Sequence, residues 1–244
     1  MWLQRVSAVI LLVSGGESLL APRAARARAR PLRAFGLPDF GNPLDKAAEA
    51  LKDKMADDEL GMSVVKLQVA CRCKDRSIHS LLPSLQRLGA GADTSTNRGL
   101  GAFVSDAALA LLRRRADWEA SAGGCEFFRE GREGDAEGAF NRIVLAEGAK
   151  FDRTENYIRA GDAGKATTAV VSVIACVYGD MRERIGENVA GSDAATHKAL
   201  SELAAEATGE DVVVAAELMW CPDEPEEILG MSDLVESWPE LLSL

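Results

Sequence analysis

The sequence has little of the residue types that usually carry catalysis or metal binding. Its 244 residues include two histidines and five cysteines, and aromatic residues make up 5%. The cysteine number is odd and no C-x-x-C pair occurs, so neither a disulfide framework nor a zinc site is predicted. G-x-S-x-G and H-E-x-x-H are absent as well, which removes two common signs of a hydrolase. We therefore predict no catalytic residues and no cofactor.

Long hydrophobic runs are also missing. A helix that crosses a bilayer needs roughly 18 or more consecutive apolar residues, and the longest apolar run here is 169–178. Its β-branched composition predicts a buried strand instead. We expect no transmembrane span in the mature chain, although peripheral membrane association stays open.

Basic residues are scarce outside the N-terminus. The first 35 residues hold six of the 28 basic residues and one of the 38 acidic residues, which leaves 22 against 37 and a net charge of −15. A surface this acidic does not favour nucleic acid, whose binding depends on Lys and Arg that neutralise phosphates. It suits a soluble protein, or one that meets a basic protein partner.

The first forty residues are typical of a targeting sequence. An apolar run at 6–13 and a small-residue exit at 18–21 resemble a secretory signal, and the Arg-rich, acid-poor stretch at 23–33 resembles a transit peptide. In this order they predict a bipartite presequence over 1–40 and a plastid (chloroplast) location. A mitochondrial presequence, or a secretory signal before a basic mature start, is the alternative.

The remainder predicts a single α+β domain. Asn42 and Pro43 open an acidic amphipathic helix over 41–60, and residues 61–244 then alternate between strand and helix patterns. The segment 118–128 is ambiguous, because Gly123 and Gly124 interrupt it. We expect a two-layer α/β sandwich with a three- to four-stranded sheet and about five helices. The expected strands are 62–73, 118–128, 167–178 and 211–220, and the expected helices are 78–88, 100–112, 135–150, 194–207 and a short one near 232.

Two groups of polar residues are candidates for an interaction surface. Alternation along the first strand places Lys66, Gln68 and Arg72 on the side opposite Val65 and Leu67, where an ordinary solvated sheet face is the alternative. The second group, Asp93, Thr94 and Ser95, precedes a helix, where a helix cap is the alternative.

Clustered carboxylates after a buried strand offer a different kind of site. Asp223, Glu224, Glu226 and Glu227 could hold Mg²⁺ or Ca²⁺, and this loop would then serve a small plastid enzyme or a ligand-binding or metal-binding domain. The prolines within the cluster, at 222 and 225, favour a solvated loop instead.

Several segments, taken in order, resemble a known family. They are VVKLQVA at 64–70, AFNR at 139–142, VVSVIACVYG at 170–179, AELMWCP at 216–222 and WPELLSL at 238–244. This set resembles the plastid family of unknown biochemical function that includes the fluctuating-light acclimation protein, and the similarity runs from about Gly61 to Leu244.

The resemblance implies a non-enzymatic role at photosynthetic (thylakoid) membranes, in adjusting photoprotective energy dissipation (non-photochemical quenching) to changing light. The family has no established catalytic residues to transfer. Its members often carry a Gly-rich stretch and a membrane-spanning segment ahead of the domain, where this chain has the acidic helix over 41–60. We therefore expect a soluble or peripheral plastid protein, at the thylakoid or envelope, that acts through a protein partner.

Overall fold

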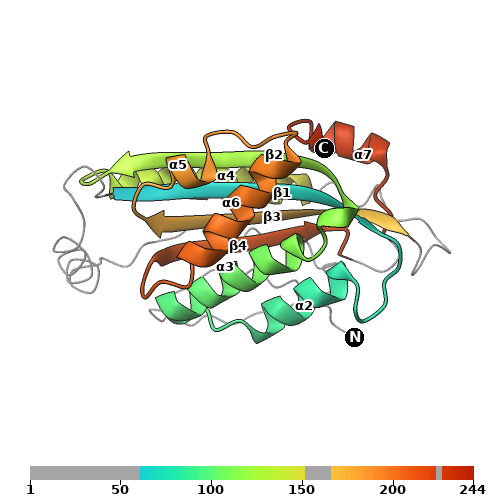
Figure 1. Ribbon diagram of the computed structural model, residues 1–244, viewed down its shortest axis with the longest axis horizontal. Coiled ribbons are helices and arrows are strands. Elements are labelled where there is room, and N and C mark those ends of the chain that lie inside the picture. The colour runs from blue at the N-terminus through green and yellow to red at the C-terminus, as the bar shows by residue number, and fades with distance from the viewer. Residues whose placement is uncertain (1–60, 152–165, 224–226) are drawn as a thin grey trace, which may run out of the picture.

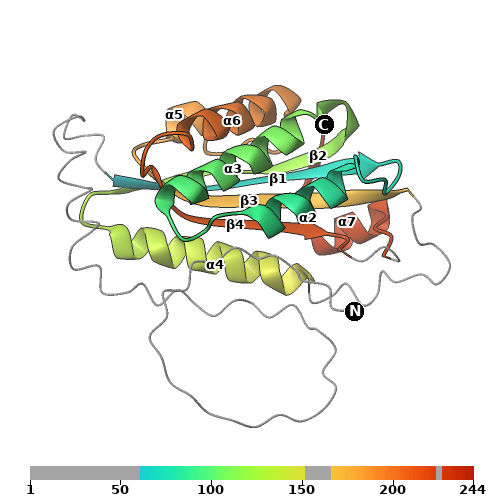
Figure 2. The ribbon, with the colours of Figure 1, turned by 90° about the horizontal axis from the view of Figure 1, so that it is seen from below.

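The computed structural model describes residues 61–151, 166–223 and 227–244, which form one five-stranded sheet with helices on both of its faces (Figures 1 and 2). The strands are β1 (Gly61–Cys73), β2 (Trp118–Arg129), β3 (Thr167–Tyr178), β4 (Val213–Cys221) and β5 (Leu242–Ser243). The helices are α2 (Leu81–Gly91), α3 (Asn97–Leu112), α4 (Glu133–Phe151), α5 (Arg182–Ile185), α6 (Asp193–Glu206), α7 (Met231–Ser237) and the 3₁₀ turn η2 (Arg115–Asp117). The predicted presequence and the helix over 41–60 lie outside the described residues.

All neighbouring strands of the sheet are antiparallel. The order is β4-β3-β1-β2-β5, so β1 lies in the centre between β3 and β2. The α+β class is confirmed, but the predicted strand number is too low. The additional strand, β5, has two residues, and such a short segment carries no alternation that a sequence pattern could show.

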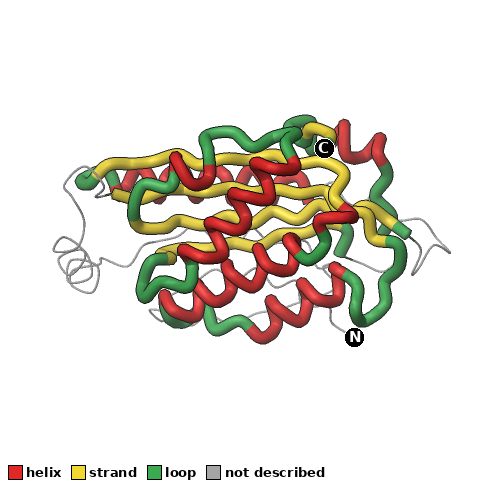
Figure 3. Tube along the Cα trace, in the orientation of Figure 1, coloured by secondary structure: helices red, strands yellow, loops and turns green. Residues whose placement is uncertain are grey.

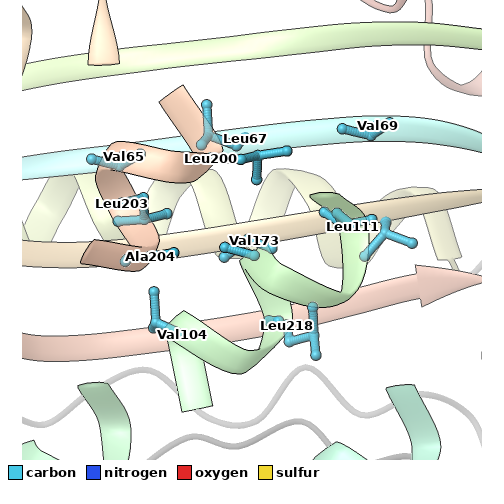
Figure 4. Packing of buried hydrophobic residues seen from close by; sticks show 14 of the residues in the cluster. Val65, Leu67, Val69, Val104, Leu111, Val173, Leu200, Leu203, Ala204 and Leu218 are labelled. Carbon is cyan, nitrogen blue, oxygen red and sulfur yellow. The ribbon is translucent and has the colours of Figure 1, made fainter. Parts of the chain in front are cut away.

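One face of the sheet packs against α2, α3 and α6. Val65 and Leu67 of β1 lie beside Leu200 and Leu203 of α6, and Val69 lies further along the same strand (Figure 4). Residues of β3, β4 and α3 complete this core. Each of the five named side chains is fully buried. Burial of a Val or Leu side chain stabilises a fold by about 1.5–3 kcal/mol, so this face supplies most of the apolar stabilisation that the described residues show.

The opposite face is covered by α4 and α7, and the prediction of two layers is therefore wrong (Figure 2). The N-terminal half of α4 places Ala136, Ala139 and Phe140 against the first residues of β1. At the other end of the strands, Leu234 and Trp238 of the α7 segment pack on Ala70, Val170 and neighbouring residues. Two separate apolar clusters thus lie on this face, with polar residues between them.

Strand β2 runs without a break through Gly123 and Gly124, where we had expected an interruption. The chain segment 186–191 lies along it as a loop (Figure 3), and Cys125 N–H donates to the Gly186 carbonyl at 3.0 Å. A Cβ at position 124 would lie 1.9 Å from the carbonyl oxygen of Glu187, so only glycine admits this close approach. The paired glycines therefore allow a covering segment to lie against the strand edge instead of ending the strand.

The helices in the described ranges are not of the membrane-spanning kind: none combines the length and the apolar character that a bilayer crossing requires.

Candidate functional site

A row of polar side chains crosses the sheet face that α4 covers. Lys66 and Gln68 contribute to it from the centre of β1, and Ser172 lies opposite Gln68 on β3. The strand alternation that turns Val65 and Leu67 to one face turns these residues to the other. They occupy the gap between the two apolar clusters.

Glu147 on α4 meets this row from the helix side. Its Oε1 forms ion pairs with Lys66 Nζ and with Lys150 Nζ, the latter at 2.7 Å. Its Oε2 accepts a hydrogen bond of 2.8 Å from Gln68 Nε2. The Glu147 side chain is 3% exposed. A carboxylate can lie at this depth because two ammonium groups and an amide compensate for the lost hydration.

Glu240, in the segment between α7 and β5, completes the arrangement. Its Oε1 forms ion pairs with Lys150 Nζ and, at 3.2 Å, with Lys66 Nζ. Burial by itself raises the pKa of Glu240, but the hydrogen bond from Lys150 and the charges of both lysines outweigh it and lower that pKa. We refer to the six connected side chains as the charged cluster: Lys66, Gln68, Glu147, Lys150, Ser172 and Glu240.

The alternative given for Lys66 and Gln68, an ordinary solvated sheet face, is therefore wrong, and their role in an interaction surface stays a prediction. Gln68 is fully buried, and its Nε2 also donates to Ser172 Oγ at 2.7 Å. Its Oε1 is buried and accepts no hydrogen bond from the described part of the chain. Alternation along a strand shows which residues share a face, but it does not show whether a helix will cover that face.

The charged cluster joins four parts of the chain that are far apart in sequence: β1, α4, β3 and the segment between α7 and β5. Glu147 uses both of its oxygens on partners within the protein, and Lys66 and Lys150 each contact both carboxylates. The cluster carries two positive and two negative charges. Its ion pairs and hydrogen bonds connect α4, the centre of the sheet and the C-terminal segment.

Arg72, the third candidate on β1, lies at the strand's end and is exposed, unlike the other two. Its Nε donates to Glu119 Oε1 at 2.7 Å, and Thr168 Oγ1 donates to the other Glu119 oxygen at 2.9 Å. The Arg72 side chain is 62% exposed. Of the strand candidates, Arg72 is thus the one that a partner can reach.

Asp93 and Ser95 build the turn that leads into α3. Asp93 Oδ1 accepts from Ser95 N–H at 3.0 Å and from Ser95 Oγ at 2.6 Å, and these hydrogen bonds lower the pKa of Asp93. Thr96, the residue after this group, is the N-cap, and its Oγ1 accepts from Gly99 N–H at 3.0 Å. Thr94 is half-buried in the same turn. The capping arrangement predicted from the sequence is present, and a binding role for these residues stays a prediction.

The acidic loop after β4 is only partly within the described residues. Glu224 and Glu226 lie outside them. Asp223 and Glu227 are buried, contrary to the solvated loop that the prolines favoured, and Asp223 N–H donates to Glu227 Oε2 at 2.9 Å. Among the described residues no group of three or more His, Cys, Asp or Glu side chains is placed to hold a metal ion. The metal-binding alternative stays a prediction.

All five cysteines are free and buried. Burial raises the pKa of Cys73 and of Cys125 to about 11, and that of Cys176 to about 12. Cys71 is shifted in the same direction, by burial and by the neighbouring Cys73. None of these four thiols has the lowered pKa of a nucleophilic cysteine.

Residues 61–244 match the family described as "Protein of unknown function (DUF1517)". The chain belongs to this family. A cyanobacterial protein named "Protein FLAP1 homolog A", from Synechocystis sp. (strain ATCC 27184 / PCC 6803 / Kazusa), is 26% identical to it over 207 residues. The match covers 76% of this chain and 57% of that protein. The chain thus spans a little over half the length of this curated relative. No solved structure matches the chain.

The family resemblance predicted from the ordered segments is confirmed. The charged cluster draws on three of those segments, since Lys66 and Gln68 lie in VVKLQVA, Ser172 lies in VVSVIACVYG and Glu240 lies in WPELLSL. The relative's name refers to a fluctuating-light acclimation protein.

Proposed function

We propose that this chain is a non-enzymatic plastid protein that acts through protein contacts at photosynthetic membranes and adjusts photoprotection to changing light. The observation that carries the proposal is its membership of the family over residues 61–244, together with a cyanobacterial relative named for light acclimation. The presequence predicted over 1–40 supports a plastid location. The acidic charge of the remaining chain supports a basic protein partner.

The charged cluster has a structural role in this proposal and is not itself the contact surface. Its ion pairs hold α4 and the C-terminal segment on the sheet, and all of its charges are matched within the protein. A partner must therefore be recognised by side chains outside the cluster. Arg72 and the Asp93–Ser95 turn are the exposed candidates among the residues that the sequence singled out.

Disruption of the gene in its own cells tests the proposal. Chlorophyll fluorescence is recorded under light that alternates between low and high intensity, and under steady moderate light. We expect energy dissipation to differ from that of unmodified cells in alternating light and to agree with it in steady light, because acclimation matters when the input changes. Reintroduction of the wild-type gene should restore the response. Identical fluorescence under both regimes would exclude the proposed role.

Plastid fractionation with proximity labelling from the tagged full-length protein tests the location and the partner. We expect recovery in plastids, next to proteins of the photosynthetic membrane. The variant Arg72→Glu should lose labelled partners if this strand end is the contact surface. Arg87→Glu, which places the same charge change on an exposed position of α2, is its control. Recovery in mitochondria or outside the cell would contradict the proposed location.

A further inference from the structure

Exposed apolar side chains gather at one end of the sheet, the end at which β1 stops and β2 begins. Among the described residues six large apolar side chains are exposed, and five of them belong to segments at this end. The sixth, Leu145, lies on α4 two residues before Glu147, which meets Lys66 in the middle of β1. Single exposed apolar residues are ordinary, whereas a group of them in one region marks a contact surface. The five are Ile78, Met231, Val235, Leu242 and Leu244.

Hydrogen bonds place these segments at the same end of the molecule. The first residues of β2 pair with the last residues of β1, and Leu244 N–H donates to the Glu119 carbonyl at 3.1 Å. The loop after β1 reaches the segment that leads into α7, because the Arg76 guanidinium donates to the Glu227 carbonyl. Both ribbon views show this loop and α7 toward the right-hand end of the sheet (Figures 1 and 2).

Ile78 lies in the loop between β1 and α2 and is 68% exposed. The loop is held on both sides of it. Asp75 Oδ1 accepts the Ser77 N–H at 2.8 Å, and the Arg114 guanidinium donates to the His79 carbonyl. The fold thus keeps a large apolar side chain in water, and its transfer to an apolar environment would be favourable.

The helix α7 adds two apolar side chains on one side. Met231 is 55% exposed and Val235 is 71% exposed, and residues four apart share a helix face. The opposite side of α7 packs on the sheet through Leu234 and Trp238. Glu236, which is exposed, points to another side than Val235, because successive helical residues are turned by about 100°.

The loop side of this end has a local excess of positive charge. Residues 72–80 and 113–119 together hold six basic and three acidic side chains, whereas the whole chain has a net charge of −10. Arg113, at the C-cap of α3, is exposed and forms no ion pair within the described residues. Three of the other basic side chains have acidic partners, in the pairs Arg72–Glu119, Lys74–Asp117 and Arg115–Asp193.

The opposite end of the sheet has the reverse character. There Gly61, the first residue of β1, lies opposite Arg129 near the end of β2. Residues 126–137, 180–187 and 206–211 belong to this end, and they hold eleven acidic and four basic side chains. None of the exposed large apolar residues lies in these ranges. An anionic surface would therefore attract one end of the sheet and repel the other.

We propose that the end of the sheet where β1 stops docks on an anionic lipid bilayer. Ile78, Met231 and Val235 enter the interface, and Arg113 lies near the headgroups. None of the five apolar residues lines the cavity of about 260 Å³ at this end, so they surround it as separate points instead of forming one groove. A fluid lipid interface accommodates such an arrangement more readily than a folded partner does. This contact rests on the role at photosynthetic membranes proposed above.

A fluorophore at position 78 tests the contact directly. Ile78→Cys in the full chain is labelled with a nitrobenzoxadiazole group, since the five native cysteines are buried. It is then titrated with vesicles of phosphatidylglycerol mixed with phosphatidylcholine. The emission should shift to the blue and rise as the label leaves water. Leu145→Cys with the same label is the matched control and should not respond. The readout is specific to the position, so binding through the predicted presequence would not imitate it.

Charge reversal at the two ends of α3 tests the orientation. Arg98, in the first turn, and Arg113, at the C-cap, are both exposed. In the labelled chain Arg113→Glu should raise the vesicle concentration for half of the response by about tenfold or more, because it replaces an attracted charge by a repelled one. Arg98→Glu should change it by less than about twofold, since it lies farther from the bilayer than the screening length. Vesicles of phosphatidylcholine alone should bind more weakly.

The lipid contact is overturned if the label at position 78 does not respond to the mixed vesicles, or responds no more than the label at position 145. It is also overturned if the label responds to polyglutamate and not to vesicles, which would identify an acidic protein as the partner, or if both arginine variants weaken binding equally. A failed vesicle test together with altered chlorophyll fluorescence after gene disruption would remove this contact and leave the proposed role standing.

Discussion

Lys66 on β1 and Glu147 on α4 are 81 residues apart in sequence and form an ion pair beneath the helix. Gln68, two residues further along β1, binds the second oxygen of the same carboxylate. The C-terminal half of α4 is thus held on the sheet by charge and hydrogen bonds, whereas its N-terminal half is held by Ala136, Ala139 and Phe140. Polar side chains of the central strand β1 thus hold the C-terminal half of α4 against the sheet.

Removal of the Glu147 carboxylate should destabilise the protein strongly. Glu147→Ala leaves Lys66 and Lys150 with one shared carboxylate and leaves the buried Gln68 amide without a charged acceptor. Loss of one partner from a buried pair costs about 3–5 kcal/mol, so the free energy of unfolding in urea should fall by that amount. Glu137→Ala, at a half-buried position earlier on α4, should change it by less than about 1 kcal/mol. A loss below 1 kcal/mol for Glu147→Ala would show that the cluster does not hold α4.

Replacement of a glycine by alanine should destabilise the protein at Gly124 of β2 and stabilise it at Gly148 of α4. Gly124→Ala places a Cβ 1.9 Å from the Glu187 carbonyl oxygen, and we expect a loss of about 1–3 kcal/mol from the forced shift of segment 186–191. Gly148→Ala meets nothing within 4 Å, and a helical alanine should stabilise the protein by about 0.5–1 kcal/mol. Thermal unfolding of both variants shows whether each substitution raises or lowers the melting temperature. Equal signs would contradict the close approach described at β2.

The five thiols should be unreactive in the folded protein. The pKa of Cys73 is raised by burial to about 11 and that of Cys176 to about 12, so at pH 8 the thiolate that reacts is a fraction below about 1%. Ellman's reagent should release almost no chromophore from the native protein. All five cysteines should react once guanidinium chloride unfolds it. A thiol that reacts in the native state at the rate of free cysteine would show an exposed site.

Acid should weaken the protein partly through Glu240. Its pKa is lowered in the fold, against 4.5 as the ordinary value, so the stability from its ionised form is complete above about pH 4.5. That stability is lost as the pH falls from there toward the lower, folded-state pKa. Glu240→Gln removes this contribution. The difference in unfolding free energy between wild type and Glu240→Gln should therefore be larger at pH 7 than at pH 3.

Glu236→Gln, at an exposed position of α7, is the control for this pH series. It should follow the wild-type curve closely, because an exposed carboxylate gains little from folding. A difference between wild type and Glu240→Gln that stays constant from pH 7 to pH 3 would mean that Glu240 acts through its packing and not through its charge.

Most of the secondary structure could be predicted from local patterns. Val65, Leu67 and Val69 alternate as a strand must, and the predicted span 62–73 agrees with β1. Thr96 and the residues before it form the capping turn that their side chains favour. Short elements were missed, among them α5 with four residues and β5 with two. Whether such short elements form depends on the segments they pack against, and they contain too few residues to show a helical or strand periodicity in their apolar positions.

The candidate sites were predicted less well, for a reason that Gln68 illustrates. A polar residue on alternate positions of a strand is usually solvated, and no nearby residue indicates otherwise. The acceptor that makes its burial possible is 79 residues away on α4.

The sequence by itself determined the alternation, the helix caps and the ordered segments that define the family, because each depends on residues that are neighbours along the chain. The tertiary structure decided which face of β1 is covered and which charges meet beneath α4. Contacts of that kind depend on how strands pair and helices dock, and a polar side chain has the same local pattern whether it faces water or a buried partner.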